Sequence, residues 1–337
     1  MREIAWIVSV SCLLVTLVGC SPAGDQEPSQ SRGDSTATGD VKAKGVVGVS
    51  VMTLTNPFFM VVAKNLEKEL APHGYTIELH SAENDAAKQQ NQVKDFIVKK
   101  CAAIVLNPTD SKAIGPAIVE ANHAGIPVFT VDIRCLDPTA RVVAHVGTDN
   151  YGGGKLAGKA LIEAVGDSGG KVVLLDHEVV ESTIERAKGF KEVLEAHNRS
   201  GKPGKFELVA ELPCGGARDV GFRSTEDAIQ SHPDIVGLFA VNDPAALGAR
   251  AALEKAGKAE QVKIIGFDGQ PEGKKAIKDG KIYADPIQYP DKMGLETGRA
   301  IIKYFNGEEV RPRLDIPTSL YRQADAEKDP EINDGAG

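Results

Sequence analysis

The sequence has few of the motifs on which enzymes and metal sites are built. It contains five cysteines and seven histidines, but no Cys-x-x-Cys pair and no His or Cys at zinc spacing. A Walker loop and a nucleophile elbow are absent as well. We therefore predict no bound metal, no cofactor and no enzymatic activity.

Basic runs are also absent, and the formal net charge is −8, which argues against nucleic acid as a partner. Aromatic residues make up 5% and hydrophobic residues 42% of the chain, as in ordinary globular proteins. The length of residues 45–323 favours two domains over one.

An apolar run covers residues 4–18, after Met1-Arg2-Glu3. It is short for a membrane-spanning helix, and small residues precede Cys20, as at a signal cleavage site. Leu17-Val18-Gly19-Cys20 resembles a bacterial lipobox. We therefore expect residues 1–19 to be a lipoprotein signal peptide and Cys20 to carry a lipid anchor. The alternative is a plain signal peptide with an incidental cysteine.

Residues 21–44 are mainly Ser, Gly, Asp, Pro, Gln and Thr. Such a segment cannot bury enough apolar surface to offset its ordering entropy. We therefore expect residues 20–44, with the lipidated cysteine, to be a flexible tether.

Three cysteines lie in the body of the chain. Cys101 opens an apolar run and is expected to pack inside the protein. Cys135 and Cys214 could pair in an exported protein.

Short apolar runs alternate with amphipathic segments along residues 46–316. The strands are predicted at 46–51, 76–79, 103–106, 128–131, 142–146, 171–175, 206–212, 236–240, 262–266, 282–284 and 314–316. The helices are predicted at 58–71, 86–100, 111–124, 151–165, 183–197, 218–231, 244–256, 271–279 and 291–306. Apolar strands linked by helices indicate an α/β protein with parallel sheets covered on both faces. The pattern restarts near residue 142, so we predict two doubly wound lobes with a ligand between their crevices.

Asn56-Pro57-Phe58-Phe59 follows the first strand. Two aromatic rings behind an amide suit a sugar, which has apolar faces and a polar rim. The alternative is a helix start, with Asn56 as N-cap and two core phenylalanines.

Polar residues follow other strands of both halves, where a doubly wound sheet binds its ligands. They are Asn107, Asp132, Asn242 and Asp268. Carboxylates and amides suit a polyol, because a buried hydroxyl without a partner costs about 1–3 kcal/mol. Any one of these residues could instead be a helix N-cap, but their recurrence in both halves favours a binding site.

Arg186 and His177 are two further candidates. Arg186 lies in the first turns of a predicted helix, where a cation opposes the helix dipole, so it is expected to have a separate role such as binding adjacent hydroxyls. An exposed ion pair with Glu185 or Glu181 is the alternative. His177 follows a second-half strand and is placed to face the crevice.

Gly152-Gly153-Gly154-Lys155-Leu156-Ala157 matches the G-x-G-x-x-A pattern of dinucleotide sites. However, Thr148-Asp149-Asn150-Tyr151 separates it from the preceding strand, so no tight turn would place a phosphate on the helix end. We do not predict a dinucleotide site.

From Gly45 to about Leu320 the chain resembles the pentose/ribose-binding family of type I periplasmic sugar-binding proteins, which serve ABC importers. The motifs that carry the resemblance are Thr55-Asn56-Pro57-Phe58-Phe59, Leu106-Asn107-Pro108-Thr109-Asp110-Ser111, Val131-Asp132, Gly147-Thr148-Asp149-Asn150, Glu185-Arg186, Gly189-Phe190, Asn242-Asp243-Pro244-Ala245-Ala246-Leu247-Gly248, Gly266-Phe267-Asp268-Gly269 and Gln288-Tyr289-Pro290-Asp291.

The resemblance implies that aromatic rings stack on a sugar and that polar side chains bond its hydroxyls. The implied stacking residues are Phe58, Phe59 and Phe267, and the implied polar residues are Asn56, Asn107, Asp132, Arg186, Asn242, Asp268 and Gln288. It also implies a monomer in which ligand-driven closure presents a face to an ABC permease. The expected location is the periplasm or cell surface.

The resemblance further implies a hinge of three crossovers, near Thr148-Asp149, Gln288 and Pro317. The N-terminal lobe would comprise residues 45–148 and 289–317, and the C-terminal lobe residues 149–288 and 318–325. Residues 326–337 would form a disordered tail.

Two departures from the family pattern concern the ligand. Ile133 stands where the family has an arginine, and Arg134 follows one place later as the candidate replacement. Gly216 stands at the position of a family aromatic, and His177 is placed to occupy part of that space. We predict a binding protein for a monosaccharide, most simply a ribose-like pentose. The alternatives are a sensory receptor, or a binding protein for another sugar or polyol. A sugar-responsive repressor would need an N-terminal helix-turn-helix.

Overall fold

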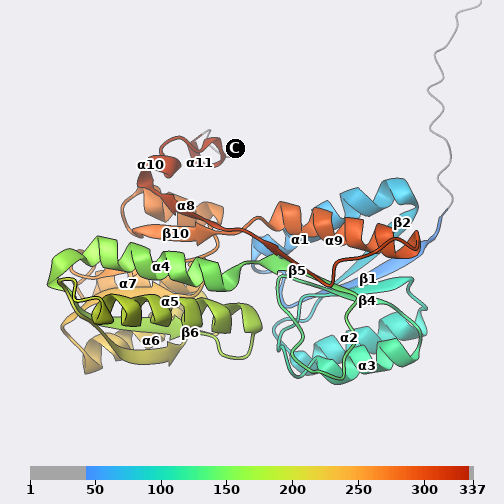
Figure 1. Ribbon diagram of the computed structural model, residues 1–337, viewed down its shortest axis with the longest axis horizontal. Coiled ribbons are helices and arrows are strands. Elements are labelled where there is room, and N and C mark those ends of the chain that lie inside the picture. The colour runs from blue at the N-terminus through green and yellow to red at the C-terminus, as the bar shows by residue number, and fades with distance from the viewer. Residues whose placement is uncertain (1–42, 334–337) are drawn as a thin grey trace, which may run out of the picture. The chain divides into compact units, whose positions relative to one another are not determined.

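The computed structural model describes residues 43–333, which form two six-stranded sheets flanked by helices (Figure 1). The first sheet has the strand order β2-β1-β3-β4-β5-β11. All its neighbouring strands are parallel. The strands are β1 (Gly45–Val51), β2 (Tyr75–Ser81), β3 (Ala103–Leu106), β4 (Val128–Val131), β5 (Ala144–Thr148) and β11 (Arg313–Ile316).

The second sheet has the order β7-β6-β8-β9-β10-β12. Its strands are parallel except for β12, which runs antiparallel to β10 at the edge. The strands are β6 (Gly170–Asp176), β7 (Phe206–Pro213), β8 (Ile235–Ala240), β9 (Lys263–Ile265), β10 (Ala284–Ile287) and β12 (Ser319–Arg322).

Helices cover both faces of the first sheet, which explains why β3 and β4 are buried at every position. Val105 belongs to the core under α1 and α9, whereas its neighbour Ile104 belongs to the core with Phe96 of α2 and Ile118 of α3. The helices are α1 (Pro57–Leu70), α2 (Ala86–Val98), α3 (Gly115–His123) and α9 (Pro290–Phe305), with a 3₁₀ turn η1 (Ala71–His73) after α1.

The second sheet carries α4 and α5 as one close pair and α6 and α7 as another (Figure 1). The helices are α4 (Asn150–Val165), α5 (Glu181–Arg199), α6 (Arg218–Ser231), α7 (Asp243–Lys255), α8 (Pro271–Lys278), α10 (Gln323–Ala326) and α11 (Pro330–Asn333), with a 3₁₀ turn η2 (Gly166–Ser168) after α4. A Cβ at Gly154 would lie 2.0 Å from the carbonyl oxygen of Arg186, and one at Gly189 would lie 2.2 Å from that of Tyr151. The glycine-rich start of α4 therefore serves helix packing.

We call the part with the first sheet, α1–α3 and α9 the first lobe, and the part with the second sheet, α4–α8, α10 and α11 the second lobe. The chain passes between them after β5, after β10 and between β11 and β12. The predicted fold class, α/β with two doubly wound lobes, is confirmed by the sheet topology and by the structural comparisons below.

The structure also departs from the sequence predictions at several places. Helix α3 begins at Gly115 because residues 111–114 form turns, and β10 begins at residue 284, where we expected a strand to end. We did not predict β12, the antiparallel edge strand. The expected disordered tail is, as far as residue 333, partly helical and tied down, since Lys274 of α8 forms ion pairs with Asp329 and Glu331.

Three smaller points concern cysteines and membranes. Cys101, Cys135 and Cys214 are all free thiols, so the possible disulfide between Cys135 and Cys214 is wrong. Within residues 43–333, no helix is both long and apolar enough to cross a membrane. The predicted signal peptide, Cys20 and most of the tether lie outside the described residues.

Candidate functional site

A cavity of about 470 Å³ lies between the lobes, at the carboxyl ends of strands from both sheets. The predicted site residues that line it are Asn56, Phe58, Phe59, Asp132, His177, Arg186, Asn242, Asp268 and Gln288. A doubly wound sheet binds its ligands at this edge. The structure therefore brings together most of the residues that the sequence singled out.

The aromatic wall of the cavity comes from the start of α1. Asn56 caps this helix, because its Oδ1 accepts a hydrogen bond from Phe58 N at 3.0 Å, and Pro57 occupies the first helical position. The rings of Phe58 and Phe59 meet edge to face with centroids 5.3 Å apart, and each residue is 5% exposed. The helix start and the two buried phenylalanines are therefore confirmed. The same helix start fixes both rings beside the cavity, and their contact with a sugar stays a prediction.

Asp132 is the acidic group of the first-lobe wall. It stands in a tight turn after β4, with φ of 63° and a hydrogen bond from Ile133 N to Val131 O across it. Its Oδ2 accepts from Asn107 Nδ2 at 3.0 Å, but its buried Oδ1 has no hydrogen-bond partner within residues 43–333. Burial raises the pKa of Asp132 to about 7, although Arg186 opposes the shift. A ligand hydroxyl would satisfy this oxygen.

The second-lobe wall is built around Asp268. Its Oδ1 accepts from Arg186 at 3.1 Å and from Gln288 Nε2 at 2.6 Å, while its Oδ2 accepts from Gln270 Nε2 at 3.2 Å. Burial raises the pKa of Asp268, and Arg186 and Gln288 act against that rise. Gln288 in turn accepts from Thr148 Oγ1 at 2.7 Å, which joins two of the crossings between the lobes.

Arg186 is held in place by neutral groups as well as by Asp268. Its Nε donates to Asn150 Oδ1 at 2.8 Å and its Nη1 to Val241 O at 2.7 Å. The guanidinium lies 3.8 Å from the centroid of the Phe267 ring. Arg186 is 3% exposed and faces the cavity, so the alternative of an exposed ion pair with Glu185 or Glu181 is wrong.

Asn242 and His177 complete the second-lobe wall. Asn242 caps α7 through Ala245 N and donates to Gly216 O at 3.0 Å. A Cβ at Gly216 would lie 3.5 Å from His177 Nδ1. The imidazole therefore borders the space beside this glycine, and burial lowers the pKa of His177, so the ring is neutral at pH 7.

Three predicted site residues lie outside the cavity lining. Asn107 is fully buried and uses its amide to hold Asp132, while Phe267 is fully buried beneath Arg186. Arg134 points to Glu181, to whose Oε1 its Nε donates at 2.7 Å. The first two support groups that face the cavity, whereas Arg134 takes part in a different contact.

Sequence reasoning missed several polar residues of the lining, among them Thr53, Thr55, Ser182, Thr183 and Gln270. Thr53 and Thr55 lie in the loop before α1, and Ser182 and Thr183 occupy the first turn of α5. The available signal was their place just after apolar strands, which we used only for amides, acids and His177. Gln270 follows Gly269 in the Gly266-Phe267-Asp268-Gly269 motif and could have been included with it.

A buried pair of carboxyl groups belongs to this part of the second lobe, and one of them, Asp243, also lines the cavity. Asp243 and Asp285 are 1% and 0% exposed, and Oδ1 of Asp243 and both oxygens of Asp285 have no hydrogen-bond partner within residues 43–333. A Cβ at Gly266 would lie 2.5 Å from Asp285 Oδ1 and 3.3 Å from Asp243 Oδ1. Burial raises the pKa of both groups, that of Asp285 to about 6. The negative charge of Asp285 raises the pKa of Asp243 further. One proton shared between them would relieve the repulsion.

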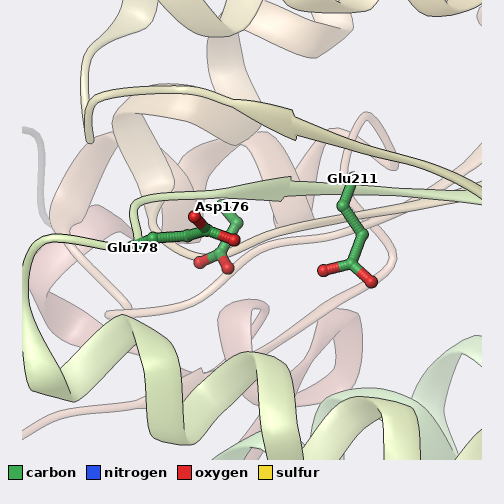
Figure 2. A group of neighbouring side chains, drawn as sticks. All are labelled: Asp176, Glu178 and Glu211. Carbon is green, nitrogen blue, oxygen red and sulfur yellow. The ribbon is translucent and has the colours of Figure 1, made fainter.

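Another acidic group lies at the end of β6. Figure 2 shows Asp176 and Glu178, at the end of this strand, and Glu211 of β7. One carboxylate oxygen from each residue lies within 4.8 Å of the others. Asp176 accepts a hydrogen bond from His177 N, and Glu211 forms an ion pair with Lys191 at 2.8 Å. Two of the three acids thus have partners already, and we assign no metal here.

The arrangement suits binding a small polyhydroxylated molecule. Two rings offer apolar faces. A carboxylate oxygen without a partner in the described part of the chain, amides and a guanidinium offer acceptors and donors around them. Among the described residues that line the cavity, no nucleophile is paired with a base.

Comparisons with known proteins agree with this geometry. The family model described as periplasmic binding protein domain matches residues 47–309. The ribose import binding protein of Salmonella typhimurium is 36% identical over 287 residues, which cover 85% of this chain and 93% of the relative. The D-apiose import binding protein of Paraburkholderia graminis is 32% identical over 87% of this chain and 92% of its own.

A solved ABC transporter solute binding protein from Bacillus halodurans, with bound myo-inositol, superposes with a TM-score of 0.76. It is 28% identical, and the match covers 86% of this chain and 98% of that structure. The family is described as periplasmic, the two relatives are named for the import of ribose and D-apiose, and the solved structure is a solute binding protein of an ABC transporter, so these are transport proteins and not enzymes. The chain belongs to the periplasmic binding protein domain family.

Proposed function

We propose that the protein captures a monosaccharide, a ribose-like pentose, between its lobes and delivers it to an ABC permease. The observation that carries this proposal is Asp132, which lines the cavity and whose buried Oδ1 has no hydrogen-bond partner among residues 43–333. An orphaned buried acceptor costs about 1–3 kcal/mol, which a ligand hydroxyl would recover.

The remaining groups divide the work of recognition. Phe58 and Phe59 would contact the apolar faces of the sugar, while Asn56, Arg186, Asn242, Asp268 and Gln288 would bond its hydroxyls. Neutral His177 can both donate and accept beside Gly216. Asn107 and Phe267 would act through Asp132 and Arg186.

Support for a sugar comes also from the relatives, which are named for ribose and D-apiose import. The bound myo-inositol of the Bacillus halodurans structure supports the alternative, a binding protein for another sugar or polyol. The further parts of the proposal are a monomeric protein anchored by a lipid on Cys20 in the periplasm or at the cell surface, with lobes at the bounds given above.

The test is a thermal-shift and calorimetry screen of the full-length protein against pentoses, hexoses and cyclitols. A ligand at 100 times its Kd should stabilise the folded state by about 2.7 kcal/mol. D-Ribose should give the largest shift. A larger shift with a hexose or with myo-inositol would favour the alternative, and no shift with any carbohydrate would refute both.

The Asp132→Ala variant tests the residue that carries the proposal. It should abolish the shift and leave the melting temperature of the unliganded protein nearly unchanged, because loss of the hydrogen bond from Asn107 to Oδ2 is offset by removal of a buried oxygen, Oδ1, that has no hydrogen-bond partner within residues 43–333. Asp95→Ala, at an exposed position on α2, is the matched control and should bind normally. A large loss of unliganded stability in Asp132→Ala would mark Asp132 as structural.

A further inference from the structure

A short segment of the second lobe touches the first lobe beside the cavity. It runs from the end of β6 into α5, over residues 178–182. Ser111 N donates to Val179 O at 3.0 Å, and Glu181 N donates to Ser111 Oγ at 2.9 Å. Ser111 belongs to the loop after β3 of the first lobe.

An ion pair reinforces this contact. Arg134, in the first-lobe loop after β4, donates to Glu181 Oε1 from Nε at 2.7 Å and also from Nη2. The Glu181 side chain is 6% exposed and that of Arg134 is 27% exposed. A carboxylate this deeply buried keeps its charge at low cost only when a partner neutralises it.

The contact is independent of the direct sugar contacts but adjacent to them. Neither Arg134 nor Glu181 lines the cavity, whereas Val180 and Ser182, on either side of Glu181, both do. Ser111 and Arg134 lie on first-lobe loops, and Val179 and Glu181 lie on the second lobe. The polypeptide chain connects these segments through the crossings between the lobes. A rotation that separates the lobes must therefore break all of these bonds together.

We propose that Glu181, Arg134 and Ser111 form a latch that holds the two lobes closed over a bound sugar. The latch rests on the proposed function, since it acts only after a ligand has entered. Its consequence is kinetic. The sugar enters while the latch is open, so the latch governs how long the sugar stays and not how fast it arrives.

The experiment compares Glu181→Gln with Glu185→Gln. Both remove one negative charge from the first turns of α5, but Glu185 pairs, among residues 43–333, only with Lys188 on its own helix, at 4.0 Å. Release of radiolabelled D-ribose into excess unlabelled sugar is followed by rapid filtration. Glu181→Gln should release the sugar roughly tenfold faster with an unchanged association rate, and Glu185→Gln should match the wild type.

Two further variants keep the result interpretable if Glu181→Gln folds poorly. Arg134→Met and Ser111→Ala should each raise the release rate. The double variant Arg134→Met with Glu181→Gln should release sugar more slowly than the two single effects added together predict, because both substitutions remove the same interaction. Equal melting temperatures of the unliganded variants would show that the fold is intact.

The outcomes separate the two proposals. A wild-type protein that takes up no labelled sugar refutes the proposed function and the latch with it. A wild type that binds, with Glu181→Gln releasing sugar at the rate of Glu185→Gln, refutes the latch alone. A change confined to the association rate would also overturn it.

Discussion

On the first-lobe wall of the cavity, Asp132 keeps one carboxylate oxygen without a partner among residues 43–333, whereas on the second-lobe wall Asp268 accepts three hydrogen bonds from Arg186, Gln288 and Gln270. Both carboxyl groups are buried and both have raised pKa values. The first wall thus leaves bonding capacity for a ligand, while the second is already organised before a ligand arrives. Preorganisation lowers the ordering cost of binding.

The comparison teaches that the same residue type has different roles on the two walls. Asp268 should matter to the stability of the unliganded protein because its partners lose bonds when it is changed. Asp132 should matter mainly to affinity.

The largest effect is expected for Arg186→Met. Removal of the guanidinium leaves Asp268 buried without its counter-charge, so the free energy of unfolding should fall by about 3 kcal/mol, and sugar binding should be lost. Urea unfolding followed by circular dichroism measures the first effect and calorimetry the second. Lys188→Met, at an exposed position on the same helix, is the control. A loss below about 1 kcal/mol would show that the second wall is not organised around this cation.

The direct comparison is Asp268→Asn against Asp132→Asn. Asp268→Asn should lower the free energy of unfolding by about 1–3 kcal/mol, because Arg186 loses a charged acceptor. Asp132→Asn should leave stability unchanged or slightly raised while weakening sugar affinity by roughly tenfold or more. Equal stability losses in the two variants would erase the difference between the walls.

The buried carboxyl pair of Asp243 and Asp285 should make stability depend on pH. The pKa of Asp285 is about 6 in the folded protein and has its ordinary value of 3.8 when unfolded. Because the folded value is raised, this group lowers stability as pH rises from about 4 to about 6, and the penalty then stays. Asp285→Asn should remove this fall and stabilise the protein at pH 7 by on the order of 2 kcal/mol. Melting temperatures of both proteins from pH 4 to pH 8 provide the check, and parallel curves would contradict it.

The smallest effect is a proton released on binding. Asp132 has a pKa of about 7, and a hydroxyl donated to the carboxylate would lower that value. Sugar binding at pH 7 should therefore release roughly half a proton, and affinity should fall as pH drops from 8 to 6. Calorimetry in buffers of different ionisation enthalpy measures the proton. If Asp132→Asn, titrated at higher concentration, releases the same amount, the proton comes from another group.

Much of this fold could be predicted from the sequence because its signals are local. Apolar runs such as 103–106 and 128–131 are strands at the predicted residues, since both faces of a parallel sheet are buried. Helix α3 was predicted four residues too early, because turn residues 111–114 carry no strong break in the pattern. Strand β12 was missed because a four-residue edge strand has too short a pattern.

The residues that make up the site could largely be predicted, but not which of their side chains face the cavity and which lie behind others. Position after a strand correctly placed Asp132 and Asp268 beside the cavity, and the unfavourable place of a cation in the first turns of a helix correctly singled out Arg186. It could not tell that Phe267 lies beneath Arg186, which depends on how α5 crosses the second sheet. Nor could it tell that Arg134 reaches Glu181, because that contact joins two lobes and residues 47 apart in sequence.

The side-chain-free surface of Gly154 has a consequence for attempts to alter what the protein binds. Since even one methyl group there would collide with the main chain at Arg186, the spacing of two helices fixes where the guanidinium stands. A larger residue at this position would push α4 and α5 apart and move Arg186 with its helix, instead of changing one contact in the cavity. Variation in ligand preference is better sought in loops that touch no helix backbone.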